Sequence, residues 1–327
     1  MAVNASEEQV EADAEIVKAS IHSRIGELSS AFHLLQDEIL AEPEPAQGER
    51  LRRVVADLIE LCADGGGQVL GELFLSEIWN YDFTKPLYIA ASLIELIRRC
   101  REHSSAAAID DDKREQLLLA ALGFNLGLIE YEKQVYENRE EFSFEEKLKL
   151  REHYPQQSGE ILKAAGLDQP VVQDAVRNHN IATDNPSTDA LLLRTPFIYA
   201  GIAMPHNPGM SNRNIDNPSR EFARMYANQE LDPVYGGLFL KIHGMAPIGS
   251  IINLESCEKA MVVQGPEDDD IASSRVRMLT NRNGVQLAKP GKIYLFTQTP
   301  SRHRGLADHH QFAWSQFSPD SMWQDQV

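Results

Sequence analysis

The histidine and acidic residues that could bind a metal ion are scattered along this chain. His153, His179 and Asp184 offer imidazole and carboxylate groups, the side chains that ligate Zn, Fe and Mn in proteins. Three separated ligands do not form a site by themselves, and a single helical histidine is commonly a hydrogen-bonded structural residue. The densest group lies near the C-terminus and comprises His303, Asp308, His309 and His310. We expect only adventitious metal binding there, because nothing nearby would hold these ligands in a fixed geometry.

The sequence lacks the short motifs of common catalytic sites. It contains no GxSxG or HExxH segment and no recognisable Ser/His/Asp arrangement. Gly65–Gly67 has neither a preceding strand nor a following Lys-Ser/Thr pair, so these glycines predict a helix stop rather than a phosphate-binding loop. The cysteines are few and far apart, which fits neither a disulfide framework nor a paired zinc motif and favours a reducing, cytoplasmic location: Cys62, Cys100 and Cys257.

Composition and charge narrow the class of protein. The 327-residue chain is 43% hydrophobic and 24% charged, which predicts one large folded domain or two smaller ones. No apolar run approaches the length of a membrane-spanning helix, so we expect no membrane span. The formal net charge of -18 repels phosphate backbones and argues against nucleic acid as a partner, although a local basic pocket could still bind a small anion.

Hydrophobic residues recur at helical spacing through most of the first 240 residues. Leu51–Cys62 has one apolar stripe, Ile89–Ile97 repeats the pattern, and Leu117–Leu128 is apolar on nearly every side, which predicts a central helix. The acidic helices expected between Ser6 and Leu40 either cap the bundle or pair with a partner chain. Helix breaks are predicted at four polar or glycine-rich stretches: 42–48, 63–67, 104–112 and 184–187.

Short β-branched segments replace the helical pattern after Met245. We expect about four antiparallel strands, at 250–254, 260–263, 275–279 and 293–297, with a turn at Asn283-Gly284 and a solvated acidic turn at 267–270. The predicted fold is therefore mainly α, a helical bundle with a small C-terminal antiparallel β appendage. Its regions are an N-terminal helical region at 1–80, a helical domain at 81–245, a β segment at 246–298 and a poorly ordered polar tail at 299–327.

A series of short segments follows in a fixed order between Tyr81 and Val263. They are Thr84–Tyr88 (TKPLY), Ala120–Leu128 (AALGFNLGL), Tyr154–Leu162 (YPQQSGEIL), His179–Pro186 (HNIATDNP), Leu231–Pro233 (LDP) and Pro247–Ser250 (PIGS). This order and spacing resemble the HD-domain phosphohydrolases, in particular the HD-GYP group that cleaves cyclic diguanylate. The resemblance covers more than half of the chain and implies an HD-domain-like bundle, closed by a small β segment, in a bacterial signalling protein.

The resemblance also shows which of the family's metal ligands this chain has exchanged for other residues. Five matched ligand positions hold different side chains, and these are Leu87, Phe124, Asn125, Tyr154 and Asn180. Leu128 stands where the family has its catalytic lysine, and 196–205 contains no clear counterpart of a later ligand aspartate. His179 and Asp184 match the first histidine and the aspartate of the family signature, whereas the GYP triplet is absent.

These exchanges predict that hydrolysis is lost. Two-metal cleavage of a phosphodiester needs a full set of ligands around ions about 3.5–4 Å apart. Leu87 and Phe124 have no lone pair, and Asn125 has only a neutral carbonyl oxygen, so we expect no catalytic residue and no metal cofactor. Apolar side chains that fill the vacated cavity would instead contribute about 1.5–3 kcal/mol each through burial. The leading hypothesis is a regulatory or interaction protein that binds a protein partner, or a second copy of itself, through its helical regions.

Two alternatives are kept beside this hypothesis. The first is a phosphodiesterase with a relocated site for Fe, Mn or Zn, whose ligands would be Glu152, His153, His179, Asp184 and His206. His153 is one position away from a matched ligand position and should therefore point about 100° away from it around the helix. The second alternative is a sensor that binds cyclic diguanylate without cleaving it.

A structural interpretation of the two retained signature residues is favoured over a functional one. Asp184 is predicted to cap a helix beginning near Asn185-Pro186, since aspartate accepts hydrogen bonds from the free amides of a first helical turn. His179 is predicted near the end of a helix spanning 168–180, where the helix dipole favours the protonated imidazole.

Overall fold

The computed structural model describes residues 19–76, 84–103, 106, 108–129, 143–180, 185–204, 217–266, 270, 272–299, 303–307 and 314–323. Its helices are α1 (Ile21–Ala41), α2 (Pro45–Phe74), α3 (Lys85–Glu102), α4 (Asp111–Gly123), α6 (Phe144–Ala164), α7 (Pro170–Asn178), α8 (Thr188–Ala203), α9 (Pro218–Ala227) and α10 (Pro233–His243). Its strands are β1 (Ile251–Leu254), β2 (Lys259–Gln264), β3 (Arg275–Met278), β4 (Ile293–Leu295) and β5 (His303–Leu306). The prediction of a mainly helical chain with a small C-terminal antiparallel sheet is confirmed.

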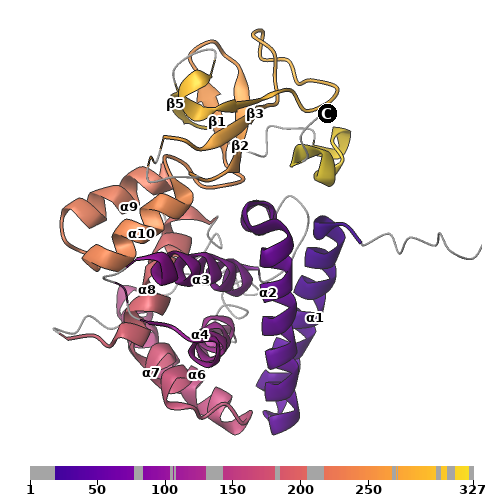
Figure 1. Ribbon diagram of the computed structural model, residues 1–327. Coiled ribbons are helices and arrows are strands. Elements are labelled where there is room, and N and C mark those ends of the chain that lie inside the picture. Colours follow the sequence, from indigo (N-terminus) through magenta and orange to yellow (C-terminus); the bar gives the residue numbers. More distant parts are fainter. Residues whose placement is uncertain are drawn as a thin grey trace, which may run out of the picture.

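The helices form a bundle around α3 and α4 (Figure 1). α1 and α2 lie side by side along one flank, while α3 contacts α2, α4, α8 and α10. The apolar stripe predicted in α2 is buried, and its buried members are Leu51, Val54, Val55, Leu58 and Cys62. All residues of α4 from Leu117 to Gly123 are buried, as expected of a central helix. Ser20 and Asp110 cap α1 and α4 by accepting from backbone amides of the first turn.

The glycine-rich segment bends α2 but does not end it, contrary to the predicted helix stop. The helix continues to Phe74 and has its kink at Gly65, whose φ of -155° and ψ of 37° are not helical. Beyond the kink, a second apolar stretch is buried: Val69, Leu70, Leu73 and Phe74. Burial of this stretch outweighs the penalty of about 1 kcal/mol for each glycine within a helix.

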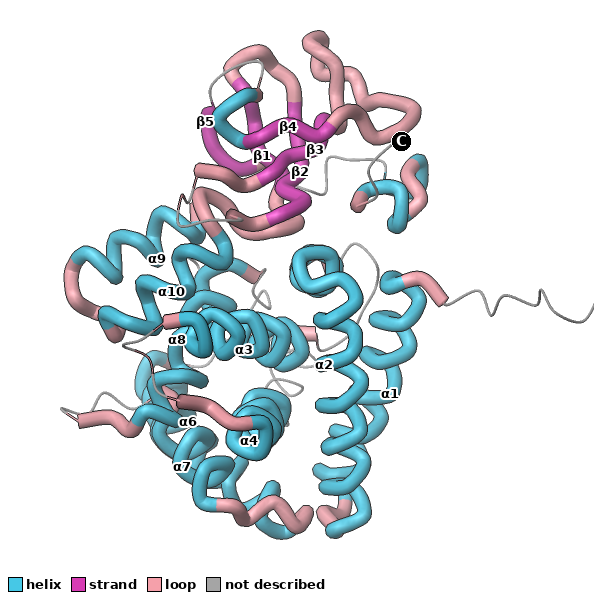
Figure 2. The backbone as a smooth tube through the Cα atoms, viewed as in Figure 1, coloured by secondary structure: helices cyan, strands magenta, loops and turns pink. Residues whose placement is uncertain are grey.

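The C-terminal sheet is antiparallel throughout, with the strand order β4-β3-β2-β1-β5 (Figure 2). It has five strands rather than about four, because β5 pairs with the free edge of β1. Ile251 and Met261 point into the main hydrophobic core. The residues that alternate with these along the strands point to the opposite face of the sheet. They build a second, smaller core that includes Ile252, Val262, Val276 and Met278.

Part of the predicted polar tail belongs to the folded molecule, which corrects the expectation for residues 299–327. Besides β5, residues 314–323 form short 3-10 turns whose apolar anchors are buried: Trp314, Phe317 and Met322. The Trp323 indole Nε1 donates to Glu72 Oε1 at 2.7 Å, and the fully buried Glu72 carboxylate also bonds His22 Nδ1 at 3.0 Å. A few anchors therefore hold this polar segment against α1 and α2.

Two sequence predictions fall partly outside the described residues. Of the helices expected between Ser6 and Leu40, the described part begins at Ile21 with α1, and most of the acidic run at 267–270 is not described. Within the part of the chain that the structure covers, no helix is both long and apolar enough to cross a lipid bilayer.

Candidate functional site

Four side chains from separate elements form what we call the aromatic cluster: Phe124, Tyr154, His179 and Phe197. Phe124 and His179 are the C-cap residues of α4 and α7, while Tyr154 lies on α6 and Phe197 on α8, helices that are neighbours in Figure 1. The His179 ring centroid lies 5.3 Å from that of Phe124 and 4.6 Å from that of Phe197, with both pairs edge-on. Three positions that the resemblance assigns to the family's metal site thus lie in contact here.

His179 is completely buried and forms hydrogen bonds through both ring nitrogens. Its Nδ1 lies 2.8 Å from the carbonyl oxygen of Val176, and its Nε2 lies 2.9 Å from the hydroxyl of Tyr154. Because a backbone carbonyl can only accept, Nδ1 carries the proton and Nε2 accepts from the Tyr154 hydroxyl. The lone pair through which Nε2 would ligate a metal ion is therefore already engaged.

Asn180 extends this chain of hydrogen bonds. Its Nδ2 donates to the Tyr154 hydroxyl at 3.2 Å and to the carbonyl oxygen of Arg151 at 3.1 Å. Tyr154 therefore accepts from Asn180 and donates to His179. The amide and hydroxyl groups at two matched ligand positions thus bind each other and the retained histidine.

Burial determines the charge state of His179. Loss of hydration is the largest cause that lowers its pKa, to about 4, and the charge of Arg194 has a smaller effect in the same direction. The imidazole is therefore neutral at neutral pH. This corrects the prediction that the dipole of the preceding helix would favour protonation, because the desolvation of a fully buried ring outweighs the dipole.

Close packing between α6 and the residues after α4 positions Tyr154. The backbone amide of Gly127 donates to Ser158 Oγ at 2.9 Å. A Cβ atom at Gly127 would lie 2.7 Å from the carbonyl oxygen of Tyr154, so a side chain there would push α6 away. The resemblance matches Gly127 to a glycine of the family pattern, which this approach of two backbones explains.

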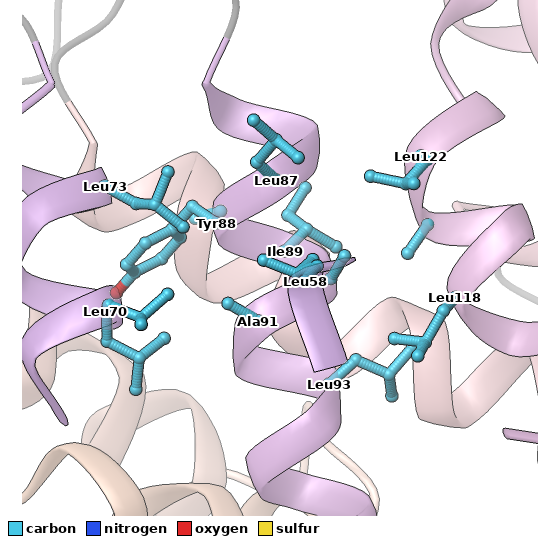
Figure 3. Close-up of a cluster of buried hydrophobic side chains, with 14 of the residues drawn as sticks. Leu58, Leu70, Leu73, Leu87, Tyr88, Ile89, Ala91, Leu93, Leu118 and Leu122 are labelled. Carbon is cyan, nitrogen blue, oxygen red and sulfur yellow. The ribbon is translucent and has the colours of Figure 1, made fainter. Parts of the chain in front are cut away.

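The other two substituted ligand positions, Leu87 and Asn125, are also buried. Leu87 is 1% exposed and belongs to the main core, and Figure 3 shows it in an apolar cluster with Leu118 and Leu122 of α4. Asn125 is 9% exposed, and its side-chain oxygen accepts no hydrogen bond from the described residues. Neither side chain brings a charge that would attract a cation.

The residues of the relocated-site alternative are not brought together in the described part. His153 is exposed and its Nδ1 lies 2.7 Å from the Lys149 carbonyl oxygen, whereas the adjacent Tyr154 is buried. Glu152 is exposed as well. Among the described residues, no three His, Cys, Asp or Glu side chains are placed to hold one metal ion. Several candidates lie outside the described residues, namely Asp184, His206, Asp308, His309 and His310, and the side chain of His303 is not described either.

The cap of α8 differs from the prediction. The helix begins at Thr188, and the hydroxyl oxygen of Ser187 accepts from the Ala190 amide at 3.0 Å. The same hydroxyl donates to a carboxylate oxygen of Asp174 on α7 and so ties the two helices together. The expectation that Asp184 would cap this helix is wrong, because the sequence supplies a serine at the required position.

Phe197 is the member of the aromatic cluster that the sequence did not reveal. It lies within 196–205, the segment in which no counterpart of a ligand aspartate was found. Its ring meets the Phe124 ring edge-on, with the centroids 5.4 Å apart. The sequence contained only an indirect signal for Phe197. The other exchanged positions carry leucine, phenylalanine and tyrosine, so a further aromatic residue in this segment was consistent with them.

The aromatic cluster can stabilise the junction of α4, α6, α7 and α8, and its described side chains include no activated nucleophile. Comparison of the chain with protein-family models, with curated proteins and with solved structures found no match in any of the three.

Proposed function

We propose that this protein is a non-hydrolysing relative of the HD-GYP phosphodiesterases that acts as a regulatory or interaction module in bacterial cyclic dinucleotide signalling. The observation that carries the proposal is the bond between Tyr154 and His179, which joins a substituted ligand position to a retained one. If these segments matched the family pattern by chance, their residues would lie at unrelated places in the fold. Instead Phe124, Tyr154, His179 and Asn180 meet in one place, which supports the resemblance.

The side chains in the aromatic cluster explain why such a relative would not cleave its ligand. Phe124 contributes an aromatic ring without a lone pair, and the accepting nitrogen of His179 is bonded to a tyrosine hydroxyl. Metal-assisted hydrolysis needs several anionic or imidazole ligands whose lone pairs are available. With the catalytic function gone, the bundle would act through binding, either of a protein partner or of a second copy through its helical surfaces.

A hydrolysis assay with cyclic diguanylate tests the proposal. The full chain is incubated with the dinucleotide in the presence of added Mn²⁺ or Fe²⁺, and products are separated by chromatography. We expect no turnover by the wild type or by Phe124→His, since one restored imidazole does not rebuild the ligand set. Metal-dependent turnover that His179→Gln abolishes would refute the proposal. A calorimetric titration with the same dinucleotide then separates a binding sensor from a module that recognises proteins alone.

A further inference from the structure

A cavity of about 440 Å³ is lined by residues of α2, α3 and α10 and by the end of β2. The three helices are neighbours in Figure 1, and the cavity shares no lining residue with the aromatic cluster. Gly67 is one of the lining residues, so the glycine-rich segment that bends α2 forms part of the wall. The nearest atom outside α2 to a Cβ added at Gly67 would be the carbonyl oxygen of Val263, at 3.8 Å, so a side chain would have room to enter the cavity.

Two carboxylates on this wall share a single arginine. Arg98 donates from Nε to Glu95 Oε2 at 3.0 Å and from Nη1 to Glu102 Oε1 at 3.4 Å. All three residues lie on α3 and line the cavity. The second oxygen of each carboxylate accepts no hydrogen bond within the part of the chain that the structure describes. This group of three side chains therefore carries one negative charge that is not balanced within it.

Arg99, beside them on α3, is a half-buried cation that no carboxylate of the described residues neutralises. Its Nη2 donates to the carbonyl oxygen of Pro266 at 3.1 Å, which holds the guanidinium against the end of β2. Its Nε is buried and has no hydrogen-bond partner among the described residues. A guanidinium has five N–H donors, so the bond to one carbonyl leaves donors on Nη1 and Nη2 for an anion.

Apolar side chains form another part of the wall. They are Leu70 of α2, Ile242 of α10, Ile248 before β1 and Pro266 after β2. Contact with these side chains favours a ligand that has an apolar portion, because burial of apolar surface contributes to binding. A volume of about 440 Å³ lies within the usual range of small-molecule sites. The wall therefore suits a small ligand that combines charged groups of both signs with an apolar portion.

We propose that this cavity binds an α-amino acid with an apolar side chain. The carboxylate of the ligand bonds the guanidinium of Arg99, and its ammonium group bonds the second oxygens of Glu95 and Glu102. The charged lining residues, two arginines and two glutamates, are neutral in sum, which matches a ligand with one charge of each sign. A phosphate is a poorer candidate, because its charge would lie close to two carboxylates. This inference goes beyond the proposed function and does not depend on it.

Calorimetric titration of the full chain at pH 7 tests the site, with L-leucine and three related probes. N-acetyl-L-leucine lacks the ammonium group, L-leucinamide lacks the carboxylate, and glycine lacks the apolar side chain. L-leucine is expected to bind. Each of the other probes should bind at least about tenfold more weakly, because each loses one charge-assisted contact or the apolar contact.

Two substitutions in the wall locate the binding, and two matched substitutions serve as controls. Arg99→Gln should weaken L-leucine binding by about tenfold, and Gly67→Leu should abolish it by filling the cavity. Arg53→Gln and Ala56→Leu make the same kinds of change at exposed positions of α2 outside the cavity and should alter the affinity by less than about threefold. Gly67→Leu tests the site even if Arg99→Gln disturbs folding in a thermal melt.

Three results would overturn the proposal. The first is that L-leucine does not bind at millimolar concentration. The second is that N-acetyl-L-leucine, L-leucinamide or glycine binds as tightly as L-leucine. The third is that the control variants weaken binding as much as the variants in the wall.

Discussion

The aromatic cluster and the buried carboxylate of Glu72 are two polar sites that hold a histidine in different ways. At the aromatic cluster, the hydroxyl of Tyr154 donates to the buried imidazole of His179 and accepts from the half-buried amide of Asn180. At Glu72, the Nδ1 atom of the half-buried His22 lies 3.0 Å from a carboxylate oxygen, and this hydrogen bond is the largest cause that raises the pKa of His22. The resemblance pointed to the first region for chemistry, but its groups are already engaged. In the second region, which no motif marked, the neighbouring carboxylate raises the pKa of the imidazole, whereas burial lowers the pKa of the imidazole in the first.

Truncation of Phe124 should have the largest effect if the aromatic cluster is part of the core. Phe124 is 3% exposed and meets two other rings edge-on. Phe124→Ala should lower the free energy of unfolding by about 3–5 kcal/mol, as for other buried aromatic residues. Urea unfolding followed by circular dichroism measures this change. Leu34→Ala, at a residue 61% exposed, is the control. A loss below about 1 kcal/mol for Phe124→Ala would contradict the core role.

Acidification should destabilise the aromatic cluster, because the buried imidazole of His179 is held in its neutral form. The folded-state pKa of His179 is about 4, below the ordinary value of 6.5, so the unfolded chain binds more protons between these values. The stability that the neutral imidazole contributes is complete above pH 6.5 and is lost as the pH falls toward 4, by about 3 kcal/mol in all. Urea midpoints measured across this range should fall less steeply in His179→Gln. If the urea midpoint of His179→Gln falls with pH as steeply as that of the wild type, His179 is exposed to solvent and not buried.

Removal of one hydroxyl tests the hydrogen bonds of the aromatic cluster separately from its packing. Tyr154→Phe keeps the ring but leaves Nε2 of His179 without its donor and Nδ2 of Asn180 without one acceptor. Unfolding free energy should fall by about 1–3 kcal/mol, the usual effect of an unsatisfied buried group. The same change at the half-buried Tyr226 is the control. Equal stability of the Tyr154 variant and the wild type would mean that the hydroxyl is not engaged.

The smallest effect is expected at the cap of α8, which supports the cluster through Phe197. Ser187→Ala removes the acceptor for the Ala190 amide and the donor to Asp174, so stability should fall by about 1–2 kcal/mol. Thermal melts of this variant and of Asn185→Ala, an exposed neighbour, give the comparison. If both variants melt like the wild type, Ser187 is not the cap that the geometry indicates.

Periodicity predicted the helical body well, because buried stripes such as that of α2 are local patterns. Periodicity could not predict contacts between segments that are far apart in the sequence. Gly65 bends α2 without ending it, since the burial that sustains the second half comes from distant segments. Ser321 and Trp323 lie in a polar stretch, yet they bond to Arg277 and Glu72 from elsewhere in the chain.

The sequence predicted the candidate site only in part. The resemblance selected Phe124, Tyr154, His179 and Asn180, but not Phe197 or the direction of the hydrogen bonds. It also could not give the charge state of His179, because the helix dipole is a local property whereas desolvation depends on all the helices that surround the ring. The contacts of Glu72 with His22 and Trp323 escaped notice for a similar reason. These three residues are far apart in the sequence, and only the packing of the C-terminal segment against α1 and α2 brings them together.

The most direct test of the central claim, that the matched ligand positions are now core, is the metal content of the protein. The full chain is produced in medium supplemented with Fe, Mn and Zn, passed over a desalting column and measured by elemental analysis. Because the Tyr154 hydroxyl engages Nε2 of His179 and Phe124 has no lone pair, we expect no stoichiometric metal. About two ions per chain, lost in His179→Gln, would contradict the account and establish a metal centre in the helical body.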